Sequence, residues 1–94
     1  MRKHDRKHMG RVAELGCVIC RRMGFGPTPA EVHHIRTGVG AGRRADDDRT
    51  IPLCYEHHRG RLGIHGMGRK AFERGYGVTE LELLEETRTA LGVQ

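Results

Sequence analysis

The sequence predicts one small α+β domain, residues 1–94, that needs more than its apolar core for stability. A chain of this length buries only about two-thirds of its unfolded surface. This chain also has no Trp, two Phe, two Tyr and 14 Gly. Two short strand-like stretches, EVHHIR and RTIPL, precede a final stretch, GVTELELLEETRTALG, with the signals of a capped helix. Domains this small commonly add disulfides or a structural metal ion.

The N-terminal region predicts a short helix. In RKHMGRVAEL, residues 6–15, the apolar side chains Val12, Ala13 and Leu15 are expected to face inward. Residues 1–10 are strongly basic, and they fit a flexible arm that contacts DNA as well as they fit a disordered terminus.

The middle of the chain predicts a two-stranded unit. EVHHIR, residues 31–36, predicts the first strand, and RTIPL, residues 49–53, predicts the second, with Pro52 leaving part of its backbone unpaired. Between them, TGVGAGRRADDD is too rich in glycine for a regular element and predicts a loop. CYEHHRGRL then predicts the start of a helix that Gly60 and Gly63 weaken.

The last segment, residues 79–92, predicts a structural helix. Thr79 and Glu82 have the spacing of a capping box, and Val78 and Leu83 have the spacing of a hydrophobic staple. The expected inner face is Leu84, Thr87 and Leu91, the expected outer acids are Glu80, Glu82, Glu85 and Glu86, and Gly92 is expected to end the helix.

The charge is unevenly distributed. Residues 1–45 contain ten Lys or Arg and three acids, whereas residues 79–94 contain one base and four acids. A basic front half favours nucleic acid as the partner, although a merely solvated basic surface fits the charge equally well. The chain begins without an apolar signal region and contains no apolar run near the roughly 20 residues of a membrane helix. We therefore expect a cytoplasmic, reduced protein without a membrane partner.

The three cysteines predict a metal site rather than disulfides. Cys17 and Cys20 form one pair with a two-residue spacing, and Cys54 and His57 form another. Two such pairs supply the four ligands of a closed tetrahedral zinc site, which also explains the odd cysteine count and the thin core. The alternative is three buried thiols and a surface histidine.

Four further histidines, His33, His34, His58 and His65, predict a second site. Neutral imidazoles need hydrogen-bond partners when they are buried, so histidine doublets make poor core packing. A second metal site would use them. It would be formed by histidine alone and open to water or phosphate, as catalytic metal sites are.

The motifs EVHHI, then a glycine-rich loop, DDRTIPLCYEHH and a trailing histidine resemble the HNH, or ββα-metal, endonucleases. HHIRTGVGAGRRADDDRTIPLCYEHH with HGMGRKAFERGYGV looks most like the phage recombination-enhancement nucleases and related small phage HNH proteins. The resemblance runs from about Cys17 to Val78. It implies a small zinc-stapled, treble-clef-like ββα-metal domain with flanking helices.

The resemblance also implies roles for individual residues. His33, His58 and His65 would bind a catalytic Mg²⁺, Mn²⁺, Ni²⁺ or Zn²⁺ ion, and His34 would be the general base that activates water. The reaction would be metal-assisted hydrolysis of a DNA phosphodiester bond that leaves a 5′-phosphate and a free 3′-hydroxyl. The structural zinc knuckle of the zinc-bearing members would fall on Cys17, Cys20, Cys54 and His57.

Two features depart from the family pattern. The family's central Asn fixes the loop between the strands, but this chain has no Asn. Asp48 stands nearest to that place and is assigned the role, while Asp46 and Asp47 fit a solvated turn. His58 and His65 are seven residues apart, about 10 Å along an unbroken helix, so a shared ion requires a break at Gly60–Gly63.

The strand poses a similar problem, because neighbouring residues of a strand point to opposite faces. His33 and His34 can share one site only if the strand end twists or bulges.

Several basic residues surround these motifs and are predicted to contact DNA phosphates. These residues are Arg36, Arg43, Arg44, Arg59, Arg61, Arg69 and Lys70. Phe72 and Tyr76 are better explained as core packing than as base-stacking groups.

The partner would be DNA, in the cytoplasm of a bacterial host if the gene belongs to a phage. The resemblance leaves open whether a recombinase filament or another phage protein is a further partner. It also leaves the oligomeric state open. Competing functions are a non-catalytic zinc module that binds nucleic acid and an RNA-cleaving enzyme.

Overall fold

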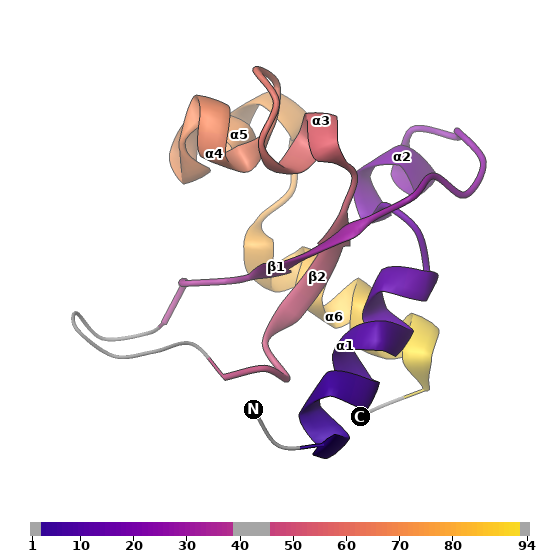
Figure 1. Cartoon of the computed structure of the whole chain (residues 1–94). Coiled ribbons are helices and arrows are strands. Elements are labelled where there is room, and N and C mark those ends of the chain that lie inside the picture. The colour runs from indigo at the N-terminus through magenta and orange to yellow at the C-terminus, as the bar shows by residue number, and fades with distance from the viewer. Residues whose placement is uncertain (1–2, 39–45, 93–94) are drawn as a thin grey trace.

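The computed structural model describes residues 3–38 and 46–92 of the chain. Within them the fold is the expected α+β arrangement of a two-stranded sheet and helices (Figure 1). The helices α3, α4 and α5 gather at one end of the strands, and α1 and α6 lie towards the other. In chain order the elements are α1 (Lys3–Glu14), α2 (Val18–Arg22), β1 (Glu31–His34), β2 (Thr50–Leu53), α3 (Tyr55–His58), α4 (Ile64–Met67), α5 (Arg69–Tyr76) and α6 (Glu80–Leu91).

The two predicted strands are confirmed and form an antiparallel pair. Glu31 of β1 faces Leu53 of β2, and His33 faces Ile51. The pairing continues beyond β1, because the backbone N–H of Ile35 donates to the carbonyl of Arg49 at 2.9 Å. The β2 strand is buried along its whole length, so the hairpin forms the centre of the domain.

The core gathers apolar side chains from most elements around this hairpin. Ile51 and Leu53 from β2 pack with Ile19 from α2, Phe72 from α5 and Leu83 from α6, and all five are almost fully buried. Phe72 is therefore a core residue, as its sequence context predicts. Cys17 and Cys20 belong to the same cluster, which places the first cysteine pair in the core.

The first helix is longer than predicted and begins at Lys3. Residues 3–10, expected as a flexible arm, form its first turns. The helix is attached further along, where Val12 is fully buried and the Arg11 guanidinium donates to the Leu91 carbonyl at 3.2 Å. This contact joins α1 to the end of α6, which runs beside it (Figure 1).

The predicted break after His58 is present. Helix α3 ends there and α4 begins at Ile64, with Gly60 and Gly63 in the turn between them. The backbone N–H of Gly60 donates to the Tyr55 carbonyl at 2.9 Å, and that of Gly63 donates to the Gly60 carbonyl at 3.0 Å. The turn passes so close to α3 that a Cβ on Gly63 would lie 2.6 Å from the carbonyl oxygen of Glu56.

The C-terminal helix confirms its predicted caps but corrects its predicted outer face. The Thr79 hydroxyl accepts from the Glu82 N–H at 3.1 Å, and the Glu82 carboxylate accepts from the Thr79 N–H at 2.9 Å. Gly92 ends the helix in the left-handed conformation, with φ of 77°. Glu80, however, is only 2% exposed. The first turn of α6 faces the hairpin, where hydrogen bonds from His33 and Thr37 satisfy this carboxylate.

No helix in the described part of the chain is long and apolar enough to cross a membrane.

Replacing Gly63 with Ala should destabilise the domain, because the new methyl group would meet the backbone of α3. Overpacking of this kind typically costs about 1–3 kcal/mol. Gly10→Ala is the matched control, since a Cβ there meets nothing within 4 Å in the middle of α1, and it should stabilise by about 0.5–1 kcal/mol. Denaturant unfolding of both variants measures the difference, and equal effects would contradict the close approach.

Candidate metal centres

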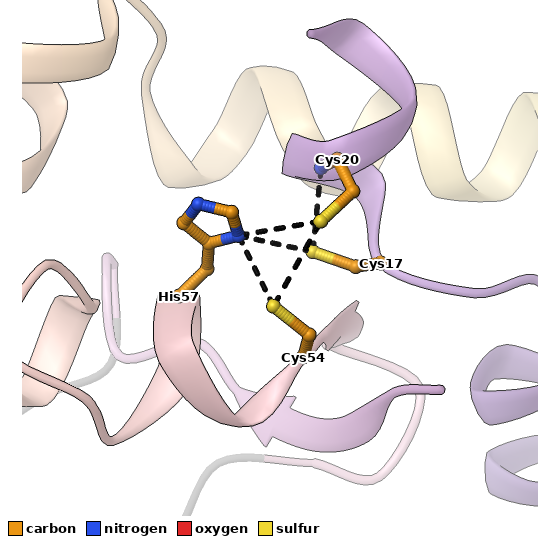
Figure 2. A group of neighbouring side chains, drawn as sticks. All are labelled: Cys17, Cys20, Cys54 and His57. Carbon is orange, nitrogen blue, oxygen red and sulfur yellow. Dashed lines mark hydrogen bonds between the residues drawn. The ribbon is translucent and has the colours of Figure 1, made fainter. Parts of the chain in front are cut away.

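The first cluster forms where two short helices begin. Cys17 is the N-cap residue of α2 and Cys20 lies within that helix, while Cys54 is the N-cap residue of α3 and His57 lies one turn later. Residues three apart on a helix face the same side, so each pair presents two ligands together. Figure 2 shows the four side chains pointing at a common centre, with the His57 ring opposite the three sulfur atoms.

The distances between the ligand atoms of this cluster are close to those around a tetrahedrally coordinated metal ion. The four candidate ligand atoms lie within 4.8 Å of one another. His57 Nδ1 is 3.6 Å from the Sγ atoms of Cys17 and Cys20 and 3.2 Å from that of Cys54, and the Cys20 and Cys54 sulfurs are 3.8 Å apart. With metal–sulfur bonds near 2.3 Å and metal–nitrogen bonds near 2.0 Å, as zinc makes, tetrahedral edges are about 3.6–3.8 Å. Three of these four distances match such edges and the His57–Cys54 distance is shorter, so the cluster could hold a metal ion after a small adjustment at Cys54.

The environment of this cluster also suits a cation. Burial raises the pKa of the Cys17 thiol to about 11, so the thiolate is disfavoured when no positive charge is near. Burial lowers the pKa of His57, which keeps its imidazole in the neutral form that binds metals. The Cys20 N–H also donates to Cys17 Sγ at 3.4 Å. A bound cation would remove the main electrostatic cost of bringing three thiolates together.

The second cluster consists of His33 from β1, His58 from α3 and His65 from α4. Their candidate ligand atoms lie within 4.8 Å of one another. The ring centroids are 5.2 Å apart for His33 and His58, 5.1 Å for His33 and His65, and 4.8 Å for His58 and His65. His33 is buried and His65 is exposed. Among residues 3–38 and 46–92 the group has three ligands and no fourth, a set that leaves coordination positions open.

Carboxylates hold two of these histidines, each by one ring nitrogen. His33 Nε2 donates to Glu80 Oε2 at 2.8 Å, and His58 Nδ1 donates to Glu31 Oε1 at 2.7 Å. An ionised carboxylate only accepts, so the other nitrogen of each ring keeps the lone pair that a metal needs. Metal-bound histidines commonly have such a carboxylate behind them. The burial of Glu80 and the Glu31–His58 contact could not be inferred from local spacing.

The surroundings favour the ionised form of Glu31 and Glu80 and the neutral form of His65. The Arg59 guanidinium and His58 lower the pKa of Glu31. Burial acts to raise the pKa of Glu80, but the hydrogen bonds from His33 and Thr37 outweigh it, and the net shift is downward. Burial, with the nearby His33 and His58, lowers the pKa of His65.

His34 does not belong to either cluster of the described residues. Its Nε2 donates to Asp47 Oδ1 at 2.8 Å, and its side chain is 38% exposed. Asp47, which fits a solvated turn by sequence, is thus the carboxylate that contacts the predicted base. Three consecutive aspartates cannot be told apart by spacing alone.

The structure does not bring Asp48 to these histidines. Its side chain is 68% exposed and lies 4.0 Å from Arg88. The base of the loop is instead held by Arg49, whose guanidinium donates to the Thr37 carbonyl, and by Thr50, whose hydroxyl donates to the Asp47 carbonyl at 3.0 Å. These contacts give the described part of the loop a fixed base without an asparagine.

The predicted phosphate contacts fall into three groups. Arg59 binds Glu31 through Nε at 3.0 Å and Nη2 at 2.5 Å and lies over the Tyr55 ring. Arg69 pairs with Glu73 at 3.0 Å. The remaining positions are Arg36, Arg61 and Lys70, which are exposed, and Arg43 and Arg44, which lie outside the described residues.

The Tyr76 ring packs against both the core and the first cluster. It lies 4.7 Å from the Phe72 ring and 5.4 Å from the His57 ring, and its hydroxyl donates to the Leu62 carbonyl at 2.8 Å. The predicted packing role of Tyr76 therefore agrees with its contacts.

A comparison with protein-family models identifies a family. The model described as "Recombination enhancement, RecA-dependent nuclease" matches residues 2–91, which is nearly the whole chain. The search of curated proteins found no match.

Substituting Cys17 with Ala should lower both the metal content and the melting temperature, because this residue connects α2 to α3 through the first cluster. Loss of a structural metal ligand removes folding free energy directly. His58→Ala is the contrasting variant, since it changes only the second cluster. Elemental analysis after gel filtration, with thermal melting, measures both. A metal-depleted Cys17→Ala protein that melts like wild type would contradict the structural role.

Proposed function

The chain belongs to the family of recombination-enhancement, RecA-dependent nucleases, and we propose that it is an HNH-type endonuclease that hydrolyses DNA phosphodiester bonds with a divalent metal ion. A phage origin is part of the same proposal. The observation that carries it is the three-histidine group, in which His65 is exposed and a carboxylate binds one ring nitrogen of His33 and of His58.

The proposed catalytic centre uses His33, His58 and His65 as ligands of a Mg²⁺, Mn²⁺, Ni²⁺ or Zn²⁺ ion. When bound there, such an ion supplies positive charge next to the non-bridging and leaving oxygens of the phosphodiester. The open side supports this role, because a catalytic ion must keep positions for water or substrate. Burial lowers the pKa of His65, which supports it as well, since only neutral imidazole is a ligand.

His34 is the proposed general base. His34 Nε2–H donates a hydrogen bond to Asp47, so the neutral ring keeps a lone pair on Nδ1 that can take a proton from the attacking water. The same carboxylate would stabilise the imidazolium that forms. Asp47 is thus the carboxylate proposed to orient the base, a role that the sequence pattern did not assign to any residue. The partial exposure of His34 is compatible with access for water and DNA.

The first cluster is proposed to hold a structural zinc ion. Four ligands of the Cys₃His type close a tetrahedron and leave no position for substrate. This zinc would fasten Cys54 and His57 at the start of α3, and His58 is the next residue. The ion is therefore proposed to act on catalysis only indirectly, by fixing the helix that presents His58.

DNA bound to a RecA filament is the proposed substrate, in accordance with the family description. Exposed positive charge at Arg36, Arg61 and Lys70 supports contact with phosphates. Acidic side chains on α6 at Glu82, Glu85 and Glu86 make that helix an unfavourable DNA surface.

Removing the base should separate an enzyme from a binding module. His34→Ala should lower cleavage by about 10²–10⁴-fold, the usual contribution of general base catalysis, while metal content and DNA affinity stay near wild type. His58→Ala should lose cleavage together with the second metal ion. His8→Ala, a histidine of α1 outside both clusters, is the control.

The assay measures cleavage of supercoiled plasmid and of RecA-coated DNA, with Mg²⁺ or Mn²⁺, and salt-dependent DNA binding with metal withheld. Wild-type protein that binds DNA without cutting it under any of these conditions would favour the non-catalytic module. Full activity in His34→Ala would place the base elsewhere.

A further inference from the structure

We propose that Glu80, at the start of the C-terminal helix, is a positioning residue for the catalytic metal site, because its buried carboxylate binds His33 and the base of the hairpin loop at once. The inference rests on the proposed function and assigns α6 a part in it. Sequence alone identifies this helix as purely structural, and its first turn lies outside the HNH-like motifs.

Both carboxylate oxygens of Glu80 are in use. Oε2 accepts from His33 Nε2 at 2.8 Å, and Oε1 accepts from the Thr37 hydroxyl at 2.6 Å. The residue is 2% exposed and His33 is 5% exposed. The bond from Thr37 fixes the carboxylate, and the bond to His33, shielded from water, fixes the orientation of the ring more firmly than an exposed contact could.

The backbone of Glu80 is also held in place. The Glu80 backbone N–H donates to Glu73 Oε2 at 2.8 Å, and Glu73 in turn pairs with Arg69. On the other side, the capping box of Thr79 and Glu82 fixes the first turn of α6. The position of Glu80 is therefore set by α5 and α6 together, and not by the rotamer of one side chain.

This arrangement has two chemical consequences. The carboxylate keeps the Nε2 proton on His33, so the lone pair stays on Nδ1 and the ring becomes a better ligand. It also fixes Thr37, whose carbonyl receives the Arg49 guanidinium across the hairpin. One buried group thus links a metal ligand to the base of the loop that carries Arg43 and Arg44.

Burying a carboxylate is costly unless hydrogen bonds and positive charge offset it. The hydrogen bonds are supplied by His33 and Thr37, and positive charge would come with a cation bound at His33. Metal binding and the burial of Glu80 should therefore stabilise each other. This coupling can be measured without any cleavage assay.

The test compares Glu80→Gln with Glu82→Gln. Both remove one negative charge from the first turn of α6, but glutamine at position 82 can still serve the capping box. Ni²⁺ is titrated by calorimetry into protein that carries one zinc, and the zinc content is checked afterwards. Glu80→Gln should bind Ni²⁺ about 10–100-fold more weakly than wild type and show a smaller Ni²⁺-induced rise in melting temperature. Glu82→Gln should match wild type in both.

Ni²⁺ affinity in folded Glu80→Gln within twofold of wild type would overturn the inference. His33→Ala distinguishes this failure from failure of the proposed function. If His33→Ala binds Ni²⁺ as wild type does, the three-histidine metal site itself is wrong.

If Glu80→Gln does not fold, zinc-loaded wild-type protein supplies the deciding measurement. ¹⁵N-resolved spectra should show His33 as the Nε2–H tautomer with a slowly exchanging proton in a strong hydrogen bond. A His33 ring protonated at Nδ1 alone, or an Nε2 proton in rapid exchange with water, would overturn the inference.

Discussion

The convergence of three thiols and one imidazole between α2 and α3 is the contact on which the rest of the structure depends. It joins the N-terminal third of the chain to the end of the hairpin, because Cys54 follows β2 directly. Burial raises the pKa of Cys17 to about 11, so the thiolate that a metal binds is unfavourable there without a cation. A domain with so few aromatic residues has little other apolar area to offset that cost.

The second cluster depends on the first through the backbone of α3. His57 and His58 are neighbours on that helix, and they serve different clusters. The return of His65 to the same place requires the turn at Gly60–Gly63, where a side chain would meet the α3 backbone. Any shift of α3 that follows from a change in the first cluster therefore moves one histidine of the second cluster directly and another through this turn.

Local patterns in the sequence predicted what depends on neighbouring residues. Both strands, the capping box and the break after His58 each depend on a few consecutive positions, and all are present. Contacts across the fold were not predictable in this way. Glu80 meets a histidine 47 positions earlier, so helix periodicity placed it on the wrong face. The start of α1 at Lys3 was also missed, because residues 3–5 carry no apolar side chain that would extend the helical pattern.

The charges around the second cluster explain why a metal ion would bind there first and a phosphodiester second. Under the proposed function the three histidines are metal ligands and carry no charge, and the ionised groups that contact them and their carboxylates are Glu31, Glu80 and Arg59. Two negative charges and one positive charge leave this set at about −1, which attracts a cation and repels a phosphate. A divalent ion would change the set to about +1. Under the proposed function, the same carboxylates that orient the ligands thus disfavour DNA at the empty centre and permit it at the loaded one.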